Sequence, residues 1–296
     1  MKQTYTRTLA ACYTGYVVQA VVNNFAPLLF LTFHNTYNIS MGRITTLITV
    51  NFLLQLLIDS FSAGLIDRIG YRTSLLIAHA AAALGFLCLP VLPEVMPDPY
   101  IGLLLSVVIY AVGGGLLEVM LSPVVEALPT KNKEKTMSLL HSFYCWGHVA
   151  TVLISTVFFM VFGLDNWKIM AVLWSLVPLY NFFVFRKVPI CPLEEDGEKG
   201  LSFAELLRRP AFWIMWPGAF SIGAAALRGG GTLMFALFAL AGDLGCSGGP
   251  TLVGFIAEHA GDNLKTGILW ALIFPILLMA GVILIRNTHK KAKKIE

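Results

Sequence analysis

Long apolar runs alternate with short polar segments along the first two-thirds of this chain. Each run is close to 20 residues or longer, the length at which an α-helix crosses the hydrocarbon core of a bilayer. Because only helices and closed barrels satisfy all backbone hydrogen bonds in lipid, the pattern predicts an all-α membrane protein. Six spanning helices are expected, at about 9–33, 43–66, 73–92, 100–127, 138–162 and 167–185.

The last third of the chain is organised differently. A polar stretch at 186–210 precedes three further apolar runs, at about 211–227, 232–256 and 266–285, and a basic tail. The sequence therefore predicts three parts. These are an N-terminal six-helix bundle at 1–185, a cytoplasmic linker at 186–210 and a truncated C-terminal helical part at 211–296.

The composition supports an integral, multi-pass membrane protein. Of the 296 residues, 57% are hydrophobic and 13% are charged, against about 25% charged in ordinary globular domains. The mean hydropathy is +0.74. No basic stripe is interleaved with aromatic residues, so the net charge of +4 does not indicate nucleic-acid binding. The five cysteines are scattered without paired metal spacing, and we expect neither a metal nor another cofactor.

The charges in the loops predict the orientation of the first six helices. With the N-terminus inside, the outer loops hold only Arg43 and Lys168 as basic residues. Cytoplasmic loops typically carry an excess of Lys and Arg. The N-terminus and the linker 186–210 are therefore predicted to be cytoplasmic, in a protein of the plasma (inner) membrane. The inner segments hold Lys2, Arg7, Arg68, Arg72, Lys131, Lys133, Lys135, Arg186, Lys187, Lys199, Arg208 and Arg209.

The three later runs do not fit this orientation if all of them cross. The basic tail would then lie outside, against the positive-inside rule. The run at 211–227 is the shortest, and as a helix it would reach only about 25 Å. Pro217 and Gly218 also interrupt it. Our hypothesis is a re-entrant or broken segment with both ends on the inside.

Polar residues recur at helical spacing inside four of the predicted spans. In hydrocarbon such groups need partners, so these faces are expected to meet one another or to line a hydrated central cavity. Interhelical hydrogen bonding, worth about 0.6 kcal/mol per bond, is the alternative, and for the second helix both readings stay open. The stripes are Tyr16, Gln19, Asn23 and the adjacent Asn24; Asn51, Gln55 and Asp59; Glu118, Ser122 and Glu126; and His141, Tyr144, His148, Thr151 and Ser155.

Glu118 is the strongest functional candidate. An acid at that depth costs at least ~2.5 kcal/mol on insertion scales, so it normally faces a cavity or a partner. The glycines at 113–115 beside it would let another helix backbone approach closely. They lack the Lys-Ser/Thr of a phosphate loop, and no nucleophile–base pair is evident, so an enzyme is not expected.

The sequence Gly-Leu-Ile-Asp-Arg-Ile-Gly-Tyr-Arg at 64–72 joins the second and third predicted helices. It resembles the signature loop of the major facilitator superfamily. The resemblance implies a charge latch at the inner gate, formed by Asp67, Arg68, Gly70 and Arg72. Gly70 would permit the tight turn.

Within that superfamily, residues 115–123 resemble the fourth-helix motif of fucose permease-type sugar–proton symporters, and residues 141–147 are similar to the start of their fifth helix. The pair Asn23 and Asn24 resembles the polar patch of their first helix, although this chain lacks an acid there. The resemblance implies a solute and proton site formed by Glu118, Asn23, Asn24, Tyr144, His148 and Trp146. Trp146 could stack on a sugar ring or pack against lipid, and His148 could relay protons or serve packing.

Carriers of this family have twelve helices in two halves. The resemblance implies that about three helices' worth of the second half is absent from this chain, with a join near Met215 and Trp216. We predict a secondary active transporter of a small hydrophilic solute such as a sugar, driven by protons through alternating access. The alternative is a non-transporting pseudo-transporter or an inactive truncated carrier. A homo-oligomer would cover the polar face that a short second half leaves open.

Overall fold

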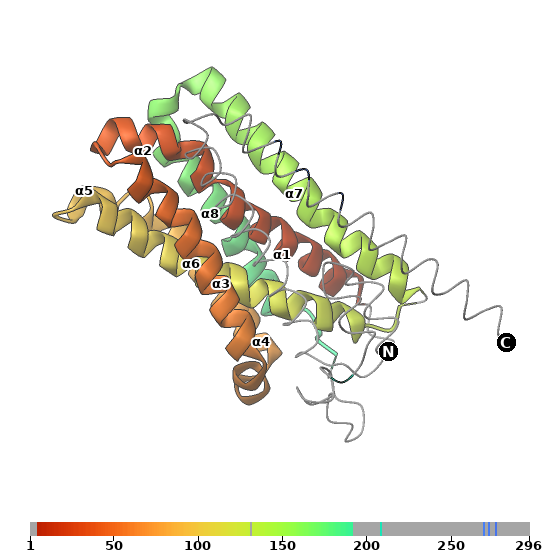
Figure 1. Ribbon diagram of the computed structural model, residues 1–296. Coiled ribbons are helices and arrows are strands. Elements are labelled where there is room, and N and C mark those ends of the chain that lie inside the picture. Colours follow the sequence, from red (N-terminus) through yellow and green to blue (C-terminus); the bar gives the residue numbers. More distant parts are fainter. Residues whose placement is uncertain are drawn as a thin grey trace.

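Six helices of membrane-spanning length form the described bundle (Figure 1). This computed structural model describes residues 5–130 and 132–191, together with the isolated positions 208, 269, 272 and 276. The predicted all-α fold and its six spans are confirmed. The spans are Thr6–Tyr37, Gly42–Phe61, Tyr71–Cys88, Pro99–Glu126, Lys135–Phe162 and Leu164–Phe185.

The first span is broken, where the sequence pattern predicted one continuous helix. Helix α1 (Thr6–Asn24) is followed by a 3-10 turn, η1 (Ala26–Leu29), and by α2 (Phe30–Tyr37). Pro27 explains the break, because proline has no backbone N–H to donate to the preceding turn. The chain tightens there, and the N–H of Leu28 donates to the carbonyl of Phe25 at 3.1 Å.

Side-chain caps and glycines set the ends of the other helices. The side chains of Ser40, Asp98 and Asn132 each accept a backbone N–H at a helix start. The cap at Asn132 lets the fifth long helix begin at Lys133, about five residues earlier than expected. Gly70 and Gly163 end helices with φ near +83° and +84°. The helices are α3 (Met41–Ile69), α4 (Tyr71–Cys88), α5 (Leu92–Val95), α6 (Pro99–Glu126), α7 (Lys133–Phe162), η2 (Leu164–Asn166) and α8 (Trp167–Phe185).

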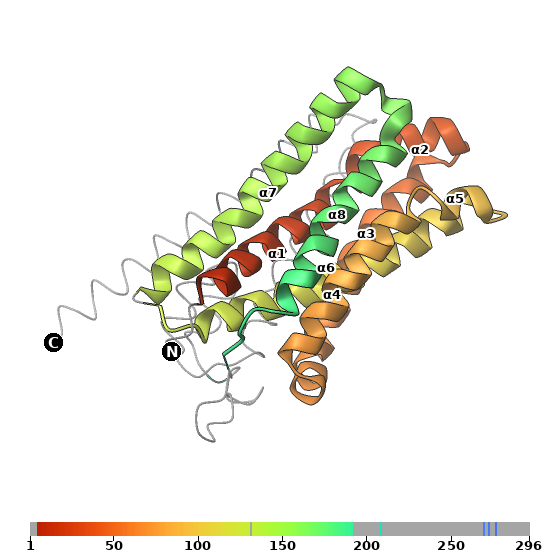
Figure 2. The same cartoon turned by 180° about the vertical axis from the view of Figure 1, so that it is seen from behind.

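Helix α6 is the centre of the packing and contacts α1, α3 and α4. Its glycines allow the close approach that the sequence predicted. A Cβ at Gly113 would lie 2.6 Å from the carbonyl oxygen of Ala78 on α4, and one at Gly115 would lie 3.1 Å from the Cα of Gln55 on α3. Helix α8 packs on α4 and α1, whereas α7 lies at the edge of the bundle and packs mainly on α1 (Figures 1 and 2).

The two ends of the bundle are tied by different contacts. We call the end where α1 begins the N-side and the opposite end the far side. On the N-side, the guanidinium of Arg72 donates to the carbonyls of Phe185 and Val188 at 2.6 and 2.8 Å. Thr8 Oγ1 donates to the carbonyl of Pro189 at 2.7 Å. These bonds fix the end of α8 against the starts of α4 and α1.

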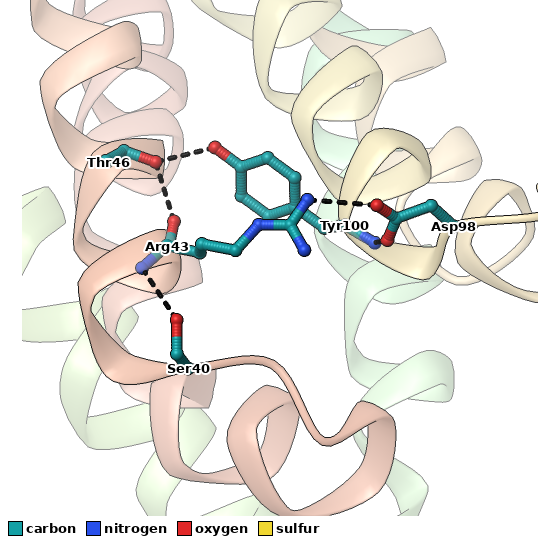
Figure 3. A network of polar contacts seen from close by, with 5 residues as sticks. All are labelled: Ser40, Arg43, Thr46, Asp98 and Tyr100. Atoms are coloured by element: carbon teal, nitrogen blue, oxygen red, sulfur yellow. Dashed lines mark hydrogen bonds and ion pairs between the residues drawn. The ribbon is translucent and has the colours of Figure 1, made fainter.

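Two ion pairs join helices on the far side. Arg43 of α3 donates to Asp98 at 2.9 Å, and its guanidinium lies over the ring of Tyr100 (Figure 3). Lys168 of α8 donates to Glu94 at 2.6 Å. Arg43 and Lys168 are the two basic residues that the sequence predicted for the outer loops, and both are paired with carboxylates.

These far-side pairs predict a loss of stability in acid. The bond from Lys168, with a second from Tyr37, lowers the pKa of Glu94, and the bond from Arg43 lowers the pKa of Asp98. Since both carboxyls ionise more easily when folded, their stabilisation is present above the ordinary carboxyl range and is lost as the pH falls through their folded pKa values. At pH 7 we expect Glu94→Gln to lower the melting temperature in detergent, and we expect this effect to shrink as the pH falls through the folded-state pKa of Glu94. An effect of the same size at pH 7 and in strong acid would contradict this.

Several sequence predictions lie outside the described residues. They concern the runs at 211–227, 232–256 and 266–285, apart from the isolated positions, and the join near Met215 and Trp216. The linker 186–210 is described only over 186–191 and at residue 208.

Candidate functional site

Glu118 lies on α6, and its carboxylate is half-buried and held by a neighbouring helix. The side-chain amide of Gln19 on α1 donates to Glu118 Oε2 at 2.6 Å. A carboxylate at this depth needs such a donor, because it cannot exchange its hydration for lipid without a large cost. The acid therefore faces the interior of the bundle, next to α1.

Asn23, one turn along α1 from Gln19, is the hub of the polar cluster. Its Oδ1 accepts the amide of Asn51 at 3.1 Å and the amide of Gln55 at 2.8 Å, both from α3. Its own amide donates to the hydroxyl of Tyr144 on α7 at 3.3 Å. A single asparagine thus joins α1, α3 and α7.

Tyr16 extends the cluster toward the N-side. Its hydroxyl lies 3.0 Å from Ser122 Oγ on α6. Its ring meets His141 and Tyr144 edge to face, with centroids 5.1 and 6.4 Å apart. The four polar stripes recognised in the sequence therefore meet around α1. We call the set Tyr16, Gln19, Asn23, Asn51, Gln55, Glu118, Ser122 and Tyr144 the central polar cluster.

A small pocket adjoins this cluster where the first span is broken. Asn23 and Asn51 form its polar wall, and Tyr110 and Phe30 are among its aromatic residues. Several buried amide oxygens in and beside it accept no hydrogen bond from the described part of the chain. They are Gln19 Oε1, Asn51 Oδ1 and Gln55 Oε1. Such acceptors suit a ligand that brings O–H or N–H donors.

The other predicted site residues lie away from Glu118. The amide of Asn24 donates to the carbonyl of Ala20 in its own helix at 2.8 Å. On α7, Trp146 is 70% exposed and His148 is also exposed within the described bundle. Nearer the far side on the same stripe of α7, Ser155 accepts the indole N–H of Trp174 on α8 at 3.0 Å. This is an interhelical hydrogen bond, the alternative role that the sequence analysis considered for such polar stripes.

The predicted gate residues lie at the turn between α3 and α4. Gly70 makes this turn with positive φ, Arg68 is exposed, and Asp67 stands three residues before the turn. Arg72 reaches the end of α8, as described above. A latch that involves Asp67, Arg68, Gly70 and Arg72 stays a prediction.

Sequence reasoning missed a second polar contact on the other side of the bundle. His79 Nδ1 lies 2.7 Å from the carbonyl of Leu75, so it carries the proton, and Nε2 accepts from the amide of Asn181 at 2.8 Å. That amide also donates to the carbonyl of Ala11 at 3.0 Å. This bonding fixes a neutral imidazole between α1, α4 and α8. A lone histidine in an apolar run was its only sequence signal.

Among the described residues, no group of three His, Cys, Asp or Glu side chains is placed to hold a metal ion. The cluster instead offers amides, hydroxyls and a carboxylate, which bind protons and polar organic solutes.

Comparison with known proteins identifies the family. The sequence profile of the Major Facilitator Superfamily matches residues 12–257. The chain belongs to this superfamily. Its members are multi-pass membrane transporters and not enzymes, as the sequence predicted. No curated protein matches the chain significantly.

A solved structure supports the fold independently. The chain is similar to the crystal structure of a variant of the E. coli fucose:proton symporter FucP, with a TM-score of 0.61 and 14% sequence identity. The match covers 95% of this chain and 99% of that chain. The transport fold is therefore shared at a low level of sequence identity.

Proposed function

We propose that this protein is a secondary active transporter that carries a small hydrophilic solute, a sugar, together with protons. The observation that carries the proposal is the bond from Gln19 to the Glu118 carboxylate inside a polar cluster drawn from four helices. The similarity to a fucose:proton symporter supports it. The bundle spans a plasma (inner) membrane, and its N-side faces the cytoplasm, as the excess of basic residues in the inner loops predicts.

The pairing of Glu118 with an amide suits a proton carrier. The ionised carboxylate accepts from Gln19 Nε2. A protonated Glu118 donates its O–H to Gln19 Oε1 after rotation of the amide, because an amide has a donor end and an acceptor end. Both protonation states of Glu118 thus have a hydrogen-bond partner. This lowers the free-energy cost of keeping the acid inside the membrane while the site opens to one side and then to the other.

The neighbouring amides suit the hydroxyl groups of a sugar. Asn51 Oδ1 and Gln55 Oε1 are buried acceptors beside the pocket. Tyr110 and Phe30 provide flat apolar surface of the kind that packs against a sugar ring. In this proposal Asn23 positions the amides, Tyr144 borders the site, and Asn24, His148 and Trp146 contribute from its margin. Asp67, Arg68, Gly70 and Arg72 form the inner gate.

A second candidate function is binding without transport. It is favoured by the amide bonds of the central polar cluster, which hold α1 to α3 and α7 and would serve a static binding site equally well. A pseudo-transporter would bind solute or a protein partner at the same cluster. A homo-oligomer would then cover the exposed side of α7.

The test is solute-dependent proton uptake into proteoliposomes, with a panel of hexoses. We expect at least one sugar to give a signal in the wild type, and Glu118→Gln to reduce that signal to the level of protein-free liposomes. Glu126→Gln is the matched control. Glu126 lies on the same helix but pairs with Lys133 at 3.5 Å near the helix end, so this variant should transport normally.

The outcomes separate the two functions. Retained uptake in Glu118→Gln would contradict a proton-coupling role for that residue. Sugar binding without proton or sugar flux in the wild type would favour the non-transporting alternative.

A further inference from the structure

Asp59 is a second carboxylate inside a membrane span. It lies on α3 within the span Gly42–Phe61, and its side chain is 1% exposed. Acids buried at such positions are costly and are normally kept for function. No step of the proposed transport mechanism has yet used it.

The register of α3 places Asp59 next to the central polar cluster. Asn51, Gln55 and Asp59 are four residues apart and share one helix face. Asn51 and Gln55 donate from that face to Asn23 of α1. Asp59 therefore follows one turn nearer the N-side, on the same face of α3 as Asn51 and Gln55.

Two neighbouring helices put Glu118 at the same level. Helix α1 is antiparallel to α3, and one turn from Asn23 toward the N-side leads to Gln19, the donor to Glu118. Helix α6 is parallel to α3. Gln55 of α3 lies beside Gly114 and Gly115 of α6, and one turn further toward the N-side leads to Glu118. Four residues advance about 6 Å along every α-helix. Asp59, Gln19 and Glu118 thus form one layer across α3, α1 and α6.

This layer is rich in hydrogen-bond acceptors. Gln19 Oε1 and Gln55 Oε1 are buried, and neither accepts a bond from the described residues. The carboxyl groups of Asp59 and Glu118 also accept hydrogen bonds, and Glu118 Oε2 accepts one from Gln19. Two carboxylates close together in a medium of low polarity disfavour joint ionisation. A proton on one acid removes a charge and supplies a donor for the amide oxygens.

We propose that Asp59 is a second proton-binding residue of the central polar cluster and exchanges its proton in a coupled way with Glu118. This inference rests on the proposed function and adds a proton site that is contributed by α3. Within the described helices, the other titratable groups near the layer include Tyr16 and Cys12 on α1, and His141 and Tyr144 on α7. On α4, His79 is engaged by Asn181.

The first test labels buried carboxyls with dicyclohexylcarbodiimide, which reacts with protonated acids in apolar surroundings, and maps the adducts by mass spectrometry. We expect adducts on Asp59 and Glu118, each with a pH midpoint of labelling. In Asp59→Asn the midpoint of Glu118 should fall by about one pH unit or more, because a neighbouring negative charge has been removed. In Glu118→Gln the pH midpoint of Asp59 labelling should likewise fall. This second measurement tests the coupling even if the Asp59→Asn protein does not fold. Glu126→Gln should move neither midpoint.

Two results would overturn the proposal. Asp59 that stays unlabelled at every pH is not a protonated, buried acid. If the labelling midpoint of each acid stays the same when the other acid is substituted, Asp59 and Glu118 bind protons independently.

A transport assay separates this proposal from the proposed function. Asp59→Asn should retain exchange of solute across the membrane at equal concentrations but lose proton-driven accumulation. Loss of both activities would indicate a structural role. If the wild type transports no sugar, the proposed function fails, while coupled labelling of Asp59 and Glu118 still decides whether the two acids share protons.

Discussion

Gly113→Leu is expected to prevent the bundle from folding. The first atom of any side chain at this position would lie 2.6 Å from the carbonyl oxygen of Ala78 and 2.7 Å from the backbone nitrogen of Ala82. These are backbone atoms of α4, so only a separation of the two helices could relieve the overlap. Overpacking a core typically costs about 1–3 kcal/mol even when side chains can adjust. We expect no monodisperse protein after extraction into detergent.

Gly42→Leu provides the matched control. Gly42 is also a helical glycine, on α3, but nothing lies within 4 Å of its ideal Cβ. This variant should elute and melt like the wild type in size-exclusion and thermal-unfolding measurements. A Gly113→Leu protein that behaves like Gly42→Leu would show that α4 and α6 do not pack as described.

Asn23→Leu is expected to destabilise the protein strongly and to remove solute-driven proton uptake. The substitution leaves the amides of Asn51 and Gln55 buried without their acceptor. Each orphaned buried group costs about 1–3 kcal/mol. Thermal unfolding in detergent should show a fall in melting temperature, and the proteoliposome assay should show no sugar-dependent signal.

Asn24→Leu is the comparison for stability. Among the described residues, its amide bonds only to the carbonyl of Ala20 in the same helix, so no neighbouring helix of this bundle loses a partner. Its melting temperature should therefore fall much less than that of Asn23→Leu. Equal falls for the two variants would contradict the role of Asn23 as the hub of the cluster.

The polar cluster gives the bundle an interior that differs from that of a soluble protein. Lipid tails are as apolar as leucine, so apolar burial alone does not hold membrane helices together. Here close glycine contacts join α6 to α4 and α3, while amide bonds centred on Asn23 join α1 to α3 and α7. The same groups that hold the helices are those that would bind solute and protons. Substitutions in the cluster should therefore affect stability and transport together.

The sequence by itself determined the six spans, because span length and hydropathy depend only on the order of residues and the thickness of the bilayer. It also indicated the polar faces of four helices and the small residues at 113–115, because helical spacing places residues on faces without knowledge of neighbours. It did not reveal the break at Pro27, since an apolar run that includes one proline still reads as a continuous span.

Only the tertiary structure decided which polar groups meet. Asn23 and Asn24 are adjacent in the sequence, yet one joins three helices and the other bonds to its own backbone. Tyr144 and His148 lie on one predicted stripe, but α7 sits at the edge of the described bundle, so Tyr144 meets Asn23 while His148 stays exposed. The physical reason is that a hydrogen bond needs two groups about 3 Å apart. The packing of α1 against α3, α6 and α7 sets those distances, and no spacing within a single helix contains them.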